Sequence, residues 1–292
     1  MDVQAWLAER TPLVDRALEA LVPKADEEPV ALHAAMRHLL FPGGKRFRPA
    51  LALAGAEAVG ASPEDGLPAA VAVELVHTYS LVHDDLPCMD DDDERRGRPT
   101  VHVAFGEPVA VLAGDALLAA AFEVLAAAFD PIHPERSALA LRDLAHAAGS
   151  HALVGGQVDD LGFAGSPAAS AGSPPAEGAA LARQIESIHE RKTAALIAAA
   201  VVCGARLAGA DDETLLRLGA FGREVGLAFQ IADDLLDAGE DDPCTLLRAL
   251  GPDAARARAD ALLAGALARI EGLGEPAERL RELARFAVRR EQ

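Results

Sequence analysis

The chain has 292 residues, of which 51% are apolar, and a formal net charge of −19. This length allows a large core in one or two domains, and the acidity excludes ordinary binding to nucleic acid, which needs a basic face. The three cysteines, Cys88, Cys203 and Cys244, have no paired spacing, so the sequence indicates neither a disulfide framework nor a zinc site.

Helical patterns cover most of the chain, and few stretches show the period of two that is typical of strands. The sequence therefore predicts an all-α fold. The expected helices span residues 7–21, 30–40, 49–59, 68–83, 109–129, 136–153, 179–208, 212–238, 254–272 and 275–290. A segment around residues 162–178 is rich in Gly, Ala, Ser and Pro and predicts a flexible loop. Because the helices on either side of it do not close a core alone, we expect one helical domain, residues 1–292.

No membrane span is expected. The apolar run 194–205 is too short to cross a bilayer, and the longer run 109–129 is interrupted by Asp115 and Glu123. The N-terminal residues lack a basic segment followed by an apolar one, so no signal peptide is indicated. A soluble, cytoplasmic protein is the resulting expectation.

Two clusters of aspartates interrupt this apolar sequence about 150 residues apart. They contain three aspartates each: Asp84, Asp85 and Asp90, then Asp233, Asp234 and Asp237. Carboxylates suit Mg²⁺, which usually binds through one or two carboxylates plus substrate phosphates. One acidic run alone would more often be a solvated loop, but two such clusters facing each other predict a diphosphate held between metal ions. EF-hand spacing is absent.

The spacing of the aspartates along the chain differs between the two clusters. Asp233 and Asp237 lie one turn apart on the same face of a helix. Asp84 and Asp90 would diverge by about 120° on an ideal helix, but Pro87 cannot continue an ordinary helix. We therefore expect a local bulge that brings Asp90 back toward Asp84.

Positively charged residues near the clusters are candidates for binding phosphate. Lys45 and Arg48 follow a glycine pair, where exposed amides and a bidentate guanidinium suit a phosphate. Arg95 and Arg96 directly follow the acidic run, and Lys192 is one of only three lysines in the chain. Taken singly, each of these is also compatible with an ordinary basic loop or a surface side chain.

On these residues, the chain resembles the short-chain trans-prenyl diphosphate synthases, and among them the bacterial farnesyl diphosphate synthases. The resemblance covers residues 31–237 and is weaker beyond them. It is carried by GGKRFRP at 43–49, HTYSLVH at 77–83 before the first aspartate cluster, RRG at 95–97, LAGD at 112–115, GQ at 156–157 with Asp160, KT at 192–193, and FQ at 229–230 before the second cluster.

The resemblance implies a bundle of long helices around a deep central cavity, a homodimer, and about three Mg²⁺ ions held by the six aspartates. It implies that an allylic diphosphate and isopentenyl diphosphate are the substrates. The allylic diphosphate would be bound by Arg95, Lys192, Thr193 and Gln230. Isopentenyl diphosphate would be bound by Gly44, Lys45, Arg48, His77 and Arg96. Gln157 and Asp160 would line the cavity. The residues expected to matter most for catalysis are Asp84, Asp85, Asp90, Lys192 and Asp233.

The expected chemistry is ionisation of an allylic C–O bond, with the charge on the leaving diphosphate stabilised by Mg²⁺ and cationic side chains. Apolar helices would shield the carbocation from water. Tyr79 stands about 7.5 Å along the helix from Asp84 and would close the cavity floor, and Ser80 adds no further block. By resemblance this pattern favours farnesyl diphosphate as the product, with geranylgeranyl or geranyl diphosphate as alternatives.

The resemblance breaks down after Asp237. The family continues there with a long lysine-bearing loop that helps to close the site, whereas this chain has no lysine after Lys192. An active enzyme remains the expectation, with Arg248 as a candidate substitute or a partner completing the site. The alternative is a non-catalytic regulatory or partner-binding homologue. A terpene cyclase would share the fold, but the second aspartate cluster argues against it.

Overall fold

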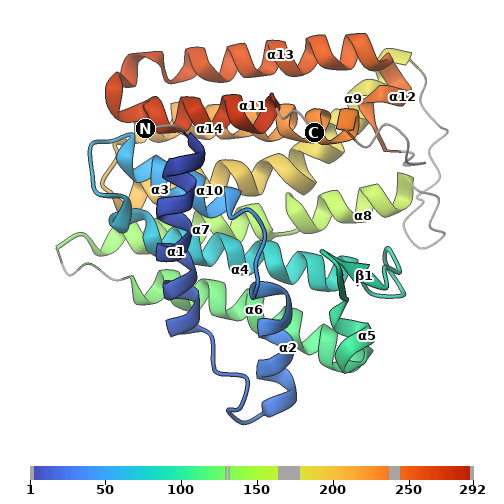
Figure 1. The fold of residues 1–292 in the computed structure, drawn as a ribbon. Helices are drawn as coiled ribbons and strands as arrows, with labels where there is room; N and C mark the ends of the chain where they lie inside the picture. The colour runs from blue at the N-terminus through green and yellow to red at the C-terminus, as the bar shows by residue number, and fades with distance from the viewer. Residues whose placement is uncertain (1–2, 129, 131, 164–177, 237–243, 290–292) are drawn as a thin grey trace.

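The computed structural model describes residues 3–128, 130, 132–163, 178–236 and 244–289, and these are folded almost entirely into helices (Figure 1). The α-helices are α1 Val3–Leu21, α2 Val30–Leu40, α3 Phe47–Glu57, α4 Leu67–Asp84, α5 Val101–Phe105, α6 Glu107–Ala127, α7 Pro134–Ala148, α8 Leu153–Phe163, α9 Gly178–His189, α10 Ala195–Leu207, α11 Asp212–Leu236, α12 Leu246–Leu250, α13 Pro252–Arg269 and α14 Glu278–Val288. Three 3₁₀ turns occupy Pro63–Gly66, Glu271–Leu273 and Glu275–Ala277, and a π-turn occupies Glu190–Ala194. The predicted all-α fold is confirmed.

Several features differ from the expected elements, among them the five-residue helices α5 and α12, which were not expected. The helix expected at 136–153 is two helices, α7 and α8, because the backbone becomes extended at Gly149. The helix expected at 179–208 is continuous but contains the π-turn. A hairpin of two-residue strands, β1 Glu94–Arg95 and β2 Arg98–Pro99, was not expected. Most of the loop expected at 162–178 lies outside the described residues.

The core is centred on α10, which packs against α3, α7 and α11. Nine of its thirteen residues are buried, from Leu196 to Ala205, because the helix is apolar on every side. Small residues let its neighbours approach closely: an ideal Cβ on Gly204 would stand 1.9 Å from the carbonyl oxygen of Ala52 in α3. The close packing of these central helices fixes the positions of the polar helix ends described below.

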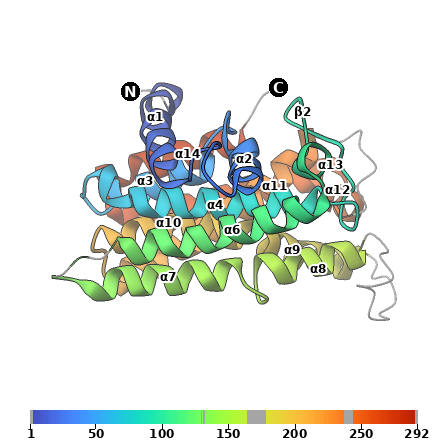
Figure 2. The ribbon, with the colours of Figure 1, turned by 90° about the horizontal axis from the view of Figure 1, so that it is seen from below.

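Helix α6 lies on the outside of the bundle against α4 and α7, and α7 and α8 follow one another along the same side (Figures 1 and 2). Its buried residues include Ala110, Ala113, Leu117 and Ala121, a three-to-four-residue spacing that turns one stripe inward. Among the described helices, α6 alone is long and apolar enough to cross a membrane by length and composition, a test that core helices of soluble proteins also meet.

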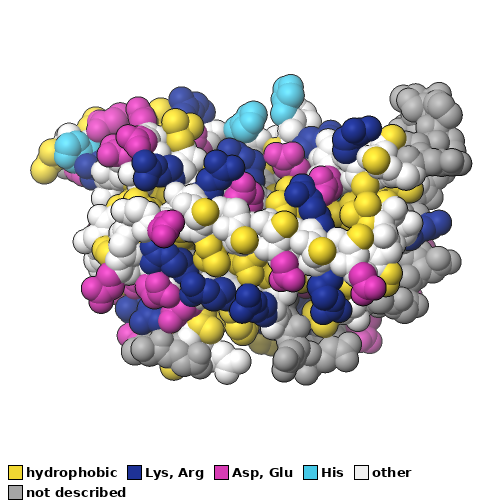
Figure 3. Space-filling model, turned by 90° about the horizontal axis from the view of Figure 1, so that it is seen from above, with side chains coloured by type: hydrophobic (Ala, Val, Ile, Leu, Met, Phe, Trp, Pro, Cys, Tyr) yellow, Lys and Arg dark blue, Asp and Glu magenta, His cyan; other side chains and the backbone are white. Residues whose placement is uncertain are grey.

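The opposite side of the bundle is polar. Helix α13 lies along α11 there, and acidic and basic side chains are interspersed over this face (Figure 3). Arg269 pairs with Glu224 at 2.9 Å, and Arg258 pairs with Glu186 at 2.7 Å. This face is therefore suited to contact with water.

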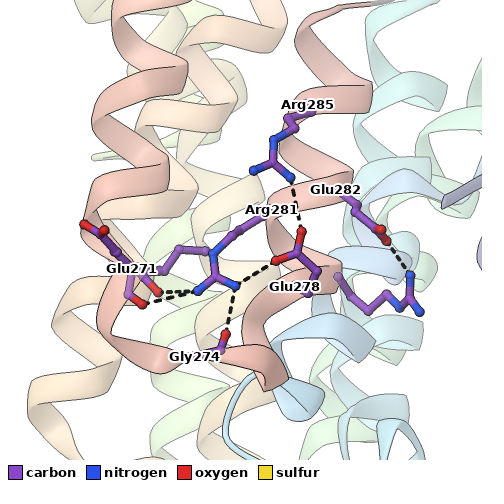
Figure 4. A network of polar contacts seen from close by, with 8 residues as sticks. Glu271, Gly274, Glu278, Arg281, Glu282 and Arg285 are labelled. Atoms are coloured by element: carbon purple, nitrogen blue, oxygen red, sulfur yellow. Dashed lines mark hydrogen bonds and ion pairs between the residues drawn. The ribbon is translucent and has the colours of Figure 1, made fainter. Parts of the chain in front are cut away.

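A polar network joins α14 to the end of α13 (Figure 4). The Arg281 guanidinium donates to the carbonyl oxygens of Ile270 and Gly274 at 2.9 and 2.8 Å, and pairs with Glu278 at 3.0 Å. Glu278 also accepts a bond from Arg285 at 3.2 Å. Arg281 thus satisfies carbonyl groups around the turn after α13, where helix geometry leaves such groups without partners, and fixes the entry to α14.

Candidate active site

The first aspartate cluster lies at the C-terminal end of α4. The helix ends at Asp84, and the Asp90 amide then donates to the Asp84 carbonyl oxygen at 2.8 Å. The chain between them therefore turns back on itself, so that Asp90 returns to Asp84 as predicted. The form differs from the expected bulge, because the turn ends the helix instead of interrupting it.

Negative charge is crowded in this cluster. Burial raises the pKa of Asp84 to about 7, with Asp90 and Asp85 adding to the effect while Lys192 and Arg95 oppose it. Burial also raises the pKa of Asp90, with Lys192 opposing it and Asp160 and Asp92 adding to it. The nearby cations thus only partly compensate these two carboxylates, a situation that favours uptake of further positive charge.

Asp85 points elsewhere. Its side chain is fully buried, and its Oδ1 atom accepts a hydrogen bond from the Arg95 guanidinium at 2.6 Å. Its Oδ2 atom is buried and has no hydrogen-bond partner among the described residues. Arg95 is held in place by the hairpin, whose two-residue turn, Arg96–Gly97, has positive φ at both positions, as tight hairpins prefer.

Lys192 connects the first cluster to α8. Its ammonium group pairs with the Asp160 carboxylate. Burial alone would lower the pKa of Lys192, but Asp160, Asp84 and Asp90 together raise it. Lys192 therefore remains charged and faces three carboxylates. Sequence reasoning named Asp160 only as a cavity-lining residue and missed this ion pair, which depends on the approach of α8 to the π-turn.

Thr193, the next residue, connects to the second cluster. Its hydroxyl donates to Gln230 Oε1 at 3.0 Å, and Gln230 Nε2 donates to Asp234 Oδ1 at 3.1 Å. Asp234 is buried and also accepts the Leu246 amide at 3.4 Å. Asp233 is half-buried on the same helix, and Asp237 lies outside the described residues. Two consecutive residues of the π-turn thus reach both clusters.

A second group of cationic residues lies near Gly44. An ideal Cβ on Gly44 would stand 2.7 Å from an Arg96 guanidinium nitrogen, so the absence of a side chain makes room for Arg96. Arg48 donates to His77 Nε2 at 3.3 Å. Burial lowers the pKa of His77 well below its usual value, and Arg48 and Arg96 add to this shift. Neutral His77 is therefore the acceptor in this pair.

The three charges that follow the glycine pair have different roles. Lys45 is exposed, and Arg48 is half-buried beside His77. Arg46 is 3% exposed and pairs with Glu74 at 2.6 Å and Asp15 at 2.9 Å. Arg46 therefore anchors the start of α3 to the core, which a run of three basic residues could not indicate.

Tyr79 is buried one turn before Asp84. It is 4% exposed, and its hydroxyl group has no hydrogen-bond partner among the described residues. The ring packs edge-on against His83 at 5.8 Å between centroids, and burial, with Asp84, raises its pKa to about 12. Ser80 donates to the His77 carbonyl oxygen at 2.9 Å. Tyr79 is thus well placed below the first cluster, and its part in product length stays a prediction.

No group of three or more acidic, histidine or cysteine side chains converges as a ready-made metal site within the described part of the chain. The residues nevertheless fit Mg²⁺ of the kind that binds through one or two carboxylates plus substrate phosphates. Asp84 and Asp90 lie close together with raised pKa values, and the buried Asp85 Oδ2 atom lacks a partner. An all-protein cage does not fit.

A cavity of about 850 Å³ lies elsewhere, between α7, α10 and α11. Its lining includes Ala195, Ala198 and Val202, with Arg142 and Arg206 among the charged residues. None of the predicted site residues lines it, so convergent charge, and not cavity volume, identifies the candidate site. The predicted deep central cavity stays a prediction.

Comparison with known proteins shows which proteins this chain is similar to. Residues 29–285 match the family model described as Polyprenyl synthetase. Farnesyl diphosphate synthase of Bacillus subtilis (strain 168) is 43% identical over 235 residues, which cover 80% of this chain and 75% of that protein. Heterodimeric geranylgeranyl pyrophosphate synthase large subunit 1 of Arabidopsis thaliana is 47% identical over 81% of this chain, and the match spans only 61% of that protein.

The fold comparison agrees. The apo structure of an FPP/GFPP synthase from Zymomonas mobilis superposes with a TM-score of 0.87 at 37% identity, covering 98% of each chain. Geranylgeranyl pyrophosphate synthetase from Pyrococcus horikoshii Ot3 superposes with a TM-score of 0.85 at 30% identity, covering 99% of this chain and 98% of that one.

Proposed function

The chain belongs to the polyprenyl synthetase family, whose members are prenyltransferases that make short-chain prenyl diphosphates, and we propose that it condenses isopentenyl diphosphate with an allylic diphosphate. The observation that carries this proposal is the meeting of both aspartate-bearing helix ends at Lys192 and Thr193. A diphosphate needs cations and donors on several sides. The π-turn offers Lys192 and Thr193, the hairpin offers Arg95, and α11 offers the Gln230 amide.

The proposed reaction begins when the allylic C–O bond breaks and charge builds on the leaving diphosphate. Lys192 and Arg95 would stabilise this charge, as preorganised cations do in a partly buried site. Asp84, Asp90 and Asp233 would hold Mg²⁺, which supplies Lewis-acid stabilisation of the same charge when bound. The π-bond of isopentenyl diphosphate then attacks the allylic carbon, and the departed diphosphate takes up a proton from the adduct, which restores a double bond.

The second cationic group is proposed to hold isopentenyl diphosphate. Arg48 and Arg96 lie beside neutral His77, and Gly44 leaves space next to the Arg96 guanidinium. Exposed Lys45 adds a flexible ammonium group, which suits a phosphate as a point charge. The Arg95–Arg96 pair would then place the two diphosphates on either side of one hairpin.

Farnesyl diphosphate is the proposed product. The support is Tyr79, a buried aromatic ring one turn before Asp84, and similarity to a Bacillus farnesyl diphosphate synthase. Geranylgeranyl diphosphate is the main alternative, since the relatives include geranylgeranyl pyrophosphate synthases of Catharanthus roseus and Capsicum annuum at 44% and 42% identity.

A homodimer formed through α6 and α8 is also proposed. Val111 and Leu112 on α6 are 41% and 58% exposed, and Val154 and Val158 on α8 are 42% and 50% exposed. Apolar faces of this kind usually mark an interface, and a second copy is preferred to a bilayer because α6 also carries exposed Asp115. The printed name of the Arabidopsis relative makes a heteromeric partner the competing arrangement. The cytoplasmic location stays a prediction.

A product assay tests the function. Purified protein is incubated with Mg²⁺, labelled isopentenyl diphosphate and dimethylallyl, geranyl or farnesyl diphosphate in parallel, and a chelator supplies the control. A C15 end product is expected. Longer products would support the proposed reaction but contradict the role of Tyr79 as the floor of the cavity. A folded protein that makes no product from any primer would contradict the proposal and favour the non-catalytic alternative.

The Tyr79 floor has its own test. Tyr79→Ala is expected to lengthen the main product by at least one isoprene unit, because it removes the ring without changing the charges around Asp84. Ser80→Ala is the matched control on the same helix, since Ser80 bonds a backbone carbonyl group. An unchanged product from Tyr79→Ala would show that other residues limit chain length.

A further inference from the structure

The π-turn Glu190–Ala194 lies within a continuous helical stretch, between α9 and α10. Its wider hydrogen-bond pattern is shown by the Ala195 amide, which donates to the Glu190 carbonyl oxygen five residues back. A π-turn holds one residue more than an α-turn, so its backbone bulges outward and needs extra room from its neighbours. Such turns are uncommon and frequently occur at functional sites.

Helix α8 supplies that room on one side through Gly156. An ideal Cβ on Gly156 would stand 2.4 Å from the Lys192 backbone nitrogen and 2.8 Å from its Cα atom, which is closer than real Cβ atoms come. Asp160 lies four residues later on α8, and therefore on the same face. This is the residue that pairs with the Lys192 ammonium group.

Helix α11 supplies room on the other side in the same way. An ideal Cβ on Gly226 would stand 2.5 Å from the Ala194 Cα atom. Gln230 lies four residues later and accepts the Thr193 hydroxyl hydrogen at 3.0 Å, and Asp234 follows after four more residues. On each side, then, a glycine admits the π-turn backbone, and the residue one helical turn later binds a π-turn side chain.

We propose that the π-turn joins the two halves of the active site, and that Gly156 and Gly226 are positioning residues that fix where Lys192 and Thr193 point. The two glycines act through backbone approach and touch no substrate themselves. A methyl group at either position would push the π-turn away from α8 or α11. Lys192 would then separate from Asp160 and the first cluster, or Thr193 from Gln230 and the second.

Chemical labelling of lysine tests this geometry without reference to activity. The chain has three lysines, and Lys24 and Lys45 are exposed and serve as internal references. In the substrate-free protein, an amine-selective reagent followed by peptide mass spectrometry should modify Lys192 more slowly than the other two. In Gly156→Ala, labelling of Lys192 should rise by about fivefold, the factor expected when a partly exposed ion pair is lost.

Steady-state kinetics provide the second readout, and this part alone rests on the proposed function. Gly156→Ala and Gly226→Ala should each lower kcat by about 10²-fold, as expected for misplacement of a catalytic group by about 1 Å. The KM for isopentenyl diphosphate, whose proposed site lies around Arg48, should change little. Gly219→Ala on α11 is the matched control, because its Cβ would meet no atom closer than 3.5 Å.

The outcomes separate the two proposals. Folded Gly156→Ala with wild-type labelling of Lys192 overturns the positioning role, and faster labelling without a loss of kcat overturns its link to the active site. An equal loss of kcat in Gly219→Ala would indicate a general packing effect and also count against it. If the wild-type chain makes no product, the proposed function fails, and labelling still decides the geometry.

Asp160→Asn replaces Gly156→Ala in the labelling experiment if Gly156→Ala does not fold. It removes the carboxylate that pairs with Lys192 and leaves the contact between Gly156 and the π-turn backbone intact. Labelling of Lys192 should again rise relative to Lys24 and Lys45. A folded Asp160→Asn protein with unchanged labelling would overturn the proposal, since Lys192 would then be held in place by something other than α8.

Discussion

The two aspartate clusters are held by chemically different surroundings. Asp84 and Asp90 face each other and the ammonium group of Lys192, and burial raises the pKa of both carboxyl groups. Asp234 accepts hydrogen bonds from neutral groups, the Gln230 amide and the Leu246 backbone. In the first cluster the cations only partly offset the cost of burying charged carboxylates, whereas Asp234 is stabilised by hydrogen-bond donors. This contrast suggests that the first cluster acts through its charge and that Asp234 acts by aligning its neighbours.

The largest expected effect is on turnover. Asp84→Asn should lower kcat by about 10²–10³-fold, the range seen when one electrostatic contact to a transition state is removed. Asp234→Asn should cost about 10-fold, as for residues that orient a site from outside its inner shell. Product formation under saturating substrate measures both. Equal losses in the two variants would remove the contrast between the clusters.

The next effect concerns stability at the hairpin. Arg95→Ala should lower the free energy of unfolding by about 3 kcal/mol, because it leaves the fully buried Asp85 carboxylate without its cationic partner. Urea unfolding followed by circular dichroism measures the loss. Arg98→Ala is a control on the same hairpin, since its bonds go to the His38 and Phe41 carbonyl oxygens. A loss no larger than that of the control would contradict the role given to Arg95.

A pH series sharpens the same contrast. The pKa of Asp84 is raised by burial to about 7, so the native state binds a proton more tightly than the unfolded chain, and this residue makes stability fall as pH rises from about 4 to about 7. In metal-free buffer, Asp84→Asn should therefore be more stable than wild type at pH 8, by about 1–3 kcal/mol, and the gap should close near pH 4. Thermal unfolding across this range provides the measurement, and a gap independent of pH would count against the raised pKa of Asp84.

The smallest effect is expected at the hydrogen bond from Thr193 to Gln230, which connects the π-turn to the second cluster. Thr193→Val removes the hydroxyl that donates to Gln230, and should destabilise the fold by about 1 kcal/mol, the usual net contribution of one hydrogen bond. Thr193→Ser keeps the hydroxyl and should remain closer to wild type. Thermal unfolding of the pair measures the difference, and indistinguishable variants would mean that the Thr193–Gln230 bond contributes no stability.

Much of the fold follows from the sequence, because long amphipathic or apolar stretches bounded by Gly and Pro predict helices. The turn that returns Asp90 to Asp84 was also predictable, since Pro87 cannot continue a helix. The π-turn was not, because one additional residue within a long helical pattern leaves no clear periodic signal over so short a stretch. The hairpin was missed because strands of two residues are too short to show alternation.

Within the candidate site, the sequence identified which residue types to expect but not which of them pair. Lys192 was predicted to bind a diphosphate, yet its partner Asp160 is 32 residues away and becomes visible only when α8 packs on the π-turn. Arg46 resembles its basic neighbours in sequence, and only the buried Glu74 beside it explains its inward position. Both contacts depend on tertiary packing, which local patterns do not encode.

The hairpin that carries Arg95 and Arg96 has a consequence for how this protein can vary. Arg95 ends a strand and reaches Asp85, whereas Arg96 begins the turn and lies against Gly44. Adding or deleting one residue here would shift the register and exchange the directions in which the two guanidinium groups point. Surface loops usually tolerate changes in length. This exposed loop should not, and we expect insertion scanning to find it as sensitive as the buried core.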